Sequence, residues 1–153
     1  MTTAADEIVL PALLRASRGA YGRAISTRLA AAGFDDVPRN GPYVLGGMVN
    51  HGGQAADLVR QLGVSKQAAS QLIDTLVLRG YLERAVNADD RRRITVHPTD
   101  RGRAAAAVVR ESVTAVDDEL ATLISPSELA GLRAGLIALC DIRDRLEDEF
   151  RAG

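Results

Sequence analysis

Cysteine and aromatic residues are scarce in this sequence of 153 residues. Cys140 is the only cysteine, which excludes an internal disulfide framework and gives no sign of an oxidising compartment. Aromatic residues make up 3% of the chain, and alanine and leucine dominate an apolar fraction of 46%. This composition favours helices.

Long apolar runs are also missing. No stretch approaches the roughly 20 apolar residues of a membrane span, and the N-terminus lacks the basic and apolar segments of a signal peptide. The expected location is therefore the cytoplasm. The length is that of one domain, which buries about two-thirds of the surface that its unfolded chain exposes.

The net charge of −1 conceals an uneven distribution along the chain. Residues 1–53 carry five basic and four acidic side chains, residues 54–103 carry nine and six, and residues 104–153 carry five and ten. The three segments thus have net charges of +1, +3 and −5, which sum to −1. A basic middle segment is compatible with an acidic partner such as nucleic acid.

The apolar spacing predicts helices through most of the chain. Residues 8–32 form the first, which ends before Gly33, and Pro42 opens a short second helix that Gly52 stops. Two long helices are expected at the other end, over residues 99–124 and 126–150. Ser125 to Glu128 reads as a capping box at the start of the last one.

The middle segment has the sequence form of a helix-turn-helix. Apolar residues repeat at intervals of three and four from Ala55 to Leu62, and again from Ala69 to Leu76. Gly63 lies in the short turn between them, and Ser65 is expected to cap the second helix, whereas Gln54 is a poor cap for the first. Residues 81–83 and 94–97 then predict a β-hairpin whose turn carries charged residues.

Polar side chains lie opposite the apolar stripe of the second helix of this pair. They are candidates for DNA contact: Ser65, Lys66, Gln67, Ser70 and Gln71. A recognition helix fits the major groove, where Gln can pair with adenine, Lys can reach guanine, and Ser can adapt to either. The alternative is an ordinary solvated surface.

Three consecutive arginines, Arg91, Arg92 and Arg93, fall on the predicted hairpin turn. Guanidinium groups placed there can neutralise phosphates or enter the minor groove beside the helix. Asp90 would repel a phosphate, so its expected role is to pair with Arg92 and shape the turn. A solvated run of mixed charges is the alternative.

The residues from Leu58 to Gly102 resemble the winged helix-turn-helix of the MarR family of bacterial transcription regulators. The resemblance rests on LGVSKQAASQLIDTL as turn and recognition helix, on RGYLER leading into the wing, and on Asp90-Arg91-Arg92 ahead of Thr99 and Gly102. Pro98 departs from the aliphatic residue more common in the family, and it should shorten the second wing strand. Gln54 departs from a common Ser or Thr cap.

The resemblance implies a mainly α fold with a small β-hairpin wing, flanked by N- and C-terminal dimerisation helices. Residues 1–34 and 100–153 would form the dimerisation helices, and residues 40–99 the DNA-binding lobe. The implied function is that of a homodimeric, sequence-specific regulator, most often a repressor, which binds double-stranded DNA at a pseudo-palindromic operator. The alternative is a winged-helix module that docks an acidic protein.

Many members of the family bind small aromatic compounds between the outer helices and the DNA-binding lobe, and release DNA when they do. By position, five residues could line such a cleft: Tyr21, Tyr43, Met48, His51 and Val109. Core packing is the alternative for each of them, because Met and Tyr at helical spacing usually fill a core.

The remaining reactive residues do not form a recognisable site. Cys140 lies among leucines of the last helix, where interface packing is favoured over a redox role. His51 and His97 have no second ligand at metal spacing, so neither a metal nor another cofactor is expected. The sequence also contains no catalytic constellation of residues, and we expect no enzymatic activity.

Overall fold

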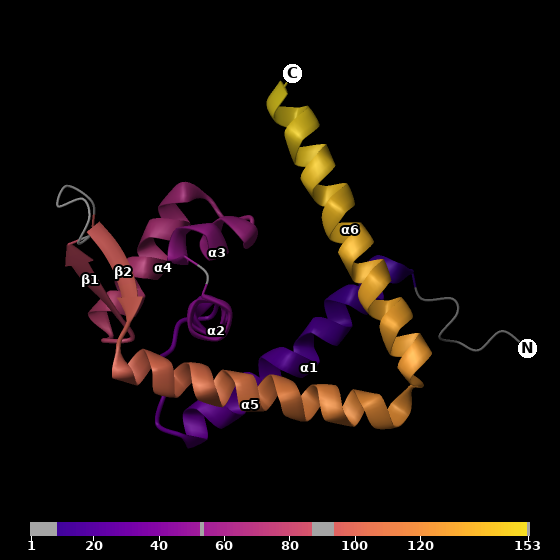
Figure 1. The fold of residues 1–153 in the computed structure, drawn as a ribbon, viewed down its shortest axis with the longest axis horizontal. Helices are drawn as coiled ribbons and strands as arrows, with labels where there is room; N and C mark the ends of the chain where they lie inside the picture. The colour runs from indigo at the N-terminus through magenta and orange to yellow at the C-terminus, as the bar shows by residue number, and fades with distance from the viewer. Residues whose placement is uncertain (1–8, 53, 87–93, 153) are drawn as a thin grey trace, which may run out of the picture. The chain divides into compact units, whose positions relative to one another are not determined.

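The computed structural model describes residues 9–52, 54–86 and 94–152, and the side chains of all of these except 51, 151 and 152. The elements follow the predicted order, with six helices and one hairpin in the described ranges (Figure 1). In chain order they are α1 (Leu10–Ala31), α2 (Gly41–His51), α3 (Ala55–Gln61), α4 (Lys66–Leu78), β1 (Leu82–Val86), β2 (Ile94–Pro98), α5 (Asp100–Leu123) and α6 (Pro126–Ala152).

Glycine ends α1 and α2, as the sequence predicts. Gly33 has a φ of 81° and Gly52 a φ of 65°. Glycine adopts this left-handed conformation readily because it has no Cβ that would clash with the backbone. The amide of Phe34 donates to the carbonyl of Leu29, so the last turn of α1 closes on itself. The predicted ends of both helices are confirmed to within two residues.

The core of the first part of the chain is built around α2, which contributes the buried residues Val44, Leu45 and Met48. Two adjacent glycines of α2 face neighbouring helices, and at Gly47 the approach is closer than a side chain would allow. A Cβ at Gly47 would lie 2.5 Å from Leu58 of α3, and one at Gly46 would lie 3.5 Å from Val109 of α5. The short helix α2 therefore packs against α3 through one glycine and against α5 through the other.

The strands β1 and β2 form a two-stranded antiparallel sheet, in which Leu82 pairs with Pro98 and Val86 with Ile94. Pro98 is the last residue of β2, where the lack of an amide proton breaks no later ladder bond. β1 also contacts α4, and Leu82, which is 1% exposed, joins the core. The mainly α fold with a β-hairpin wing is confirmed.

The start of α5 is bound to the residue that precedes β1. The Tyr81 carbonyl accepts a hydrogen bond from the Thr99 amide at 3.1 Å. The Thr99 hydroxyl donates to the Gly80 carbonyl at 2.5 Å and makes a longer contact of 3.2 Å with the Tyr81 carbonyl. The same hydroxyl caps α5 by accepting the amide of Gly102 at 3.0 Å. Gly102 lies so close to the Tyr81 carbonyl that no Cβ fits between them.

The chain divides into two compact units, residues 1–116 and 117–153, and the boundary falls within α5. In the second unit, α6 begins with the predicted capping box, in which Ser125 accepts the Glu128 amide at 3.3 Å and the Glu128 carboxylate accepts the Ser125 amide at 2.8 Å. No helix in the described ranges is long and apolar enough to cross a membrane. The division into a DNA-binding lobe and dimerisation helices stays a prediction.

Gly102→Ala should destabilise the protein by about 2–4 kcal/mol, because the new methyl group would overlap the Tyr81 carbonyl and separate α5 from β1. Urea unfolding at fixed protein concentration measures the change. Gly131→Ala is the matched control, since a Cβ at that helical position meets no atom within 4 Å among the described residues. It should leave stability unchanged or raise it by up to about 1 kcal/mol. Equal effects of the two variants would contradict the proposed close approach.

Candidate nucleic-acid interface

The turn between α3 and α4 exposes the start of α4. Gly63 has a φ of 65°, which reverses the chain after α3. Ser65 has an extended backbone, and its hydroxyl accepts the Ala68 amide at 3.2 Å. The predicted cap is thereby confirmed, whereas Gln54 makes no side-chain cap at the start of α3. The remaining free amides of the first turn of α4 give this end a partial positive charge.

One face of α4 packs against the core, and the opposite face is exposed to solvent. Leu76 is fully buried, and Ala69, Leu72 and Ile73 pack against the core. The five residues that the sequence suggests for DNA contact are all exposed: Ser65, Lys66, Gln67, Ser70 and Gln71. Because 3.6 residues make one turn, these side chains form one polar ridge along the outside of α4. Contact of this ridge with DNA remains a prediction.

The hairpin beside α4 has the position of a wing. Arg84 of β1 donates through Nη2 to Oδ1 of Asp74 on α4, so an ion pair links the strand to the helix. The four turn residues singled out in the sequence lie outside the described residues: Asp90, Arg91, Arg92 and Arg93. Their proposed roles rest on the sequence alone.

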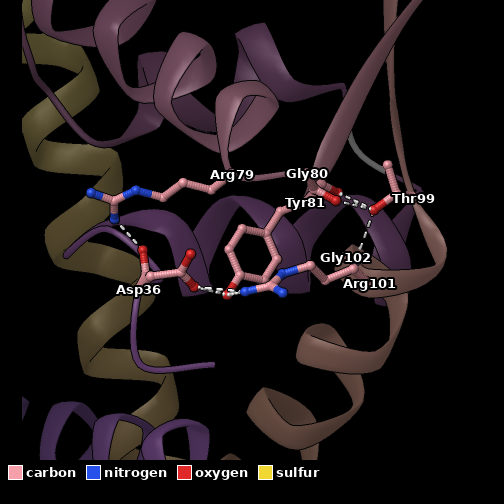
Figure 2. Close-up of polar contacts among 7 residues, drawn as sticks. All are labelled: Asp36, Arg79, Gly80, Tyr81, Thr99, Arg101 and Gly102. Atoms are coloured by element: carbon pink, nitrogen blue, oxygen red, sulfur yellow. Dashed lines mark hydrogen bonds and ion pairs between the residues drawn. The ribbon is translucent and has the colours of Figure 1, made fainter. Parts of the chain in front are cut away.

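A polar junction that the sequence did not reveal joins three distant segments (Figure 2). The Tyr81 hydroxyl donates to the Asp36 carboxylate, and Arg101 donates to that carboxylate at 2.9 Å and to the Tyr81 oxygen at 3.0 Å. Arg79 donates to the backbone carbonyl of Asp36. The Arg101 guanidinium also lies over the Tyr81 ring, 4.6 Å from its centroid. The loop after α1 is thus tied to the end of α4 and the start of α5.

These contacts change the acidity of the groups involved. The hydrogen bond from Tyr81, with further support from Arg101, lowers the pKa of Asp36 despite its partial desolvation. Burial raises the pKa of Tyr81, and the hydrogen bond to Asp36 adds to this effect. The junction therefore holds a carboxylate and a protonated phenol at physiological pH.

No local pattern could have indicated this junction. Asp36 appears in the sequence as a turn residue, and Tyr81 as the start of a strand. They are 45 residues apart, and Arg101 is 65 residues from Asp36. Only a distant signal, such as paired substitutions in an alignment, could have linked them.

An open cleft of about 1990 Å³ lies within the first unit, lined by α1, α2, α5 and the loop after α1. Tyr21, Tyr43 and Val109 are among its lining residues. Met48 is not among them; it packs into the core and is 9% exposed. Val109 borders the cleft but is also a core residue, with 6% of its surface exposed. The side chain of His51 is outside the described residues. A ligand in this cleft stays a prediction.

The cysteine and the described histidine do not belong to the α4 ridge. Cys140 is exposed on α6. His97 lies 2.8 Å from the Thr95 hydroxyl through Nε2. Within the described residues, no group of three or more His, Cys, Asp and Glu side chains could hold a metal ion.

The comparisons with known proteins agree with this geometry. The model of the MarR family matches residues 36–93, which begin in the loop after α1 and end directly before β2. The match covers the helix-turn-helix of this chain and the first strand of its hairpin, so this part of the chain is similar to the MarR family. The resemblance inferred from the sequence is thereby confirmed. No curated protein matches the chain.

Solved structures extend this MarR-type fold to most of the chain. The Staphylococcus aureus MepR–DNA complex has 20% identity and a TM-score of 0.71, over 88% of this chain and 98% of that one. Streptococcus pneumoniae FabT in complex with DNA has 19% identity and a TM-score of 0.73, over 90% and 96%. Streptomyces coelicolor PcaV, in complex with its natural ligand, has 16% identity and a TM-score of 0.67, over 92% and 98%.

Asp36→Asn should reveal how much the junction contributes to the stability of the fold, because this contribution depends on pH. The native pKa of Asp36 lies below the usual 3.8, so the charged carboxylate stabilises the fold above that pH and loses this effect as the pH falls through the lowered pKa. The variant should therefore be less stable than the wild type at neutral pH, by a margin that shrinks in acid. Urea midpoints between about pH 7 and pH 2.5 measure it.

Tyr81→Phe is the companion variant, because it keeps the buried ring and removes the largest cause of the lowered pKa. At neutral pH, Tyr81→Phe should lose less stability relative to the wild type than Asp36→Asn does, and this loss should also shrink as the pH falls. A margin that stays constant over the whole pH range would contradict the assigned role of Asp36.

Proposed function

We propose that this chain is a dimeric, sequence-specific DNA-binding regulator of transcription that acts as a repressor and is released by a small-molecule effector. The observation that carries the proposal is the polar ridge on α4, exposed and capped within a MarR-type winged helix-turn-helix. A helix with one buried and one polar face fits the major groove, which is about 12 Å wide. DNA complexes of MepR and FabT with the same fold support this reading.

The apolar surface of the outer helices supports a dimer. Val9 and Leu10, at the start of α1, are 69% and 57% exposed in the single chain. On α6, five large apolar side chains recur along one face and are exposed: Leu132, Leu136, Leu139, Leu146 and Phe150. A contiguous apolar stripe on a long helix is typical of a surface that another chain covers. A two-fold dimer would present two recognition helices to half-sites about one helical turn apart.

The lining of the cleft in the first unit supports the proposal that a small-molecule effector binds there. Its lining combines the rings of Tyr21 and Tyr43 with several arginines, including Arg15, Arg18 and Arg110. An aromatic compound with an acidic group matches such a lining in shape and charge. Both α2, which belongs to the proposed DNA-binding lobe, and α5, which contacts α2 at Gly46, border the cleft. An effector bound there would therefore favour a different position of the lobe.

Gln67→Ala and Gln71→Ala test the DNA-reading ridge. Each should weaken binding to the DNA adjoining the chain's own gene by about 5- to 150-fold, because a bidentate contact to a base contributes roughly 1–3 kcal/mol. Electrophoretic mobility shifts against this duplex and a random duplex of equal length measure affinity and preference. Thr122→Ala, an exposed polar change on α5, should alter neither. Unchanged binding by both glutamine variants, or wild type that ignores both duplexes at low salt, would contradict the proposal.

Leu136→Glu combined with Leu139→Glu tests the dimer. Two carboxylates in the apolar stripe should convert the protein to a monomer, because their burial in an interface without partners is strongly unfavourable. Light scattering coupled to size-exclusion chromatography reports the mass. Ile137→Glu is the matched control, since Ile137 is 62% exposed and lies away from the stripe. A monomeric wild type, or dissociation by the control alone, would refute the assignment of this face.

A further inference from the structure

An acidic side chain, Asp74, continues the polar ridge of α4 at its C-terminal end. Asp74 follows Gln71, Ser70 and Gln67 by three, four and seven residues, which places all four on one face of the helix. It lies opposite the buried Leu76 side of the helix, and its side chain is 59% exposed. The ridge proposed to enter the groove therefore carries a carboxylate about one turn beyond its reading residues.

A carboxylate at this position opposes DNA binding unless its charge is compensated. Duplex DNA carries one negative charge for about every 1.7 Å of its axis, and a groove concentrates their potential. The displacement of water from the interface lowers the local dielectric and strengthens every charge interaction there. An uncompensated Asp74 would meet both repulsion and the cost of losing its water.

Arg84 is placed to supply the compensating charge. Side chains alternate along a strand, so Arg84 shares the face of β1 that carries the buried Leu82 and extends toward α4. Its Nη2 donates to Oδ1 of Asp74. With 45% and 59% of the two side chains exposed, such a pair adds little to the stability of the free protein. We therefore expect the pair to act mainly on DNA binding, because the interface with DNA excludes the solvent that screens the two charges.

We propose that Arg84 is a positioning residue of the DNA interface, which acts through Asp74. It neutralises the one carboxylate on the ridge and holds the base of the wing at a fixed distance from the recognition helix. The inference rests on the proposed DNA-binding function, and it assigns a role to a strand residue that does not itself read bases. The charge of the pair, and not the stability of the lobe, is what matters to DNA.

A rescue experiment separates this role from a direct phosphate contact. Arg84→Gln should weaken binding to the duplex adjoining the gene about tenfold or more, and should reduce the steepness of its salt dependence. Asp74→Asn alone should bind at least as tightly as the wild type. The double variant, Arg84→Gln with Asp74→Asn, should regain most of the lost affinity and slope, because the carboxylate that needed compensation is gone.

Arg143→Gln is the matched control. It breaks an Arg–Asp pair with Asp144 on α6 whose side chains are 49% and 60% exposed, almost as in the Arg84 pair. It should leave affinity and salt dependence unchanged. Thermal unfolding of every variant checks that the fold persists.

The outcomes are distinct. A double variant as weak as Arg84→Gln would overturn the inference, because Arg84 would then act on the DNA directly and not through Asp74. Full binding by Arg84→Gln alone would overturn it as well. A wild type that binds neither this duplex nor a random one would refute the proposed function, and the role of Arg84 would be rejected with it.

Discussion

One backbone oxygen, the carbonyl of Tyr81, determines how the winged lobe joins the helix that follows it. It accepts the amide of Thr99, it shares the Thr99 hydroxyl with the neighbouring Gly80 carbonyl, and Gly102 lies against it. These contacts place the first turn of α5 directly beside the start of β1. Since α5 continues from that turn along α2, the orientation of the wing and the packing of the core depend on the same few atoms.

The side chain of Tyr81 extends this constraint to the loop after α1. Its ring is buried, and its hydroxyl meets Asp36 together with Arg101. Four segments of the first unit therefore converge on one tyrosine: the loop, the end of α4, the start of β1 and the start of α5 (Figure 2). Such a junction leaves α4 little freedom to rotate, because the residues at its end are held by both the core and the loop. The DNA-reading role proposed for α4 needs a helix that is held in this way.

Most of the fold could be predicted from the sequence, because its signals are local. The helix ends follow from Gly33, Gly52 and the cap at Ser65, and the buried side of α4 follows from apolar residues spaced by three and four. Residues that the local pattern describes poorly are those whose partners are distant. Met48 and Tyr43 look alike as apolar residues of α2, yet one fills the core and the other lines the cleft.

By itself, the sequence determined the order of the elements, the helix-turn-helix with its hairpin, and the polar ridge of α4, since helical and strand periods are properties of neighbouring residues. Tertiary structure alone decided that Asp36, Tyr81 and Arg101 meet, that Gly102 must lack a side chain, and that Arg84 faces Asp74. These pairings depend on how separate elements pack, and packing follows from the fit of whole surfaces that no short stretch of sequence contains.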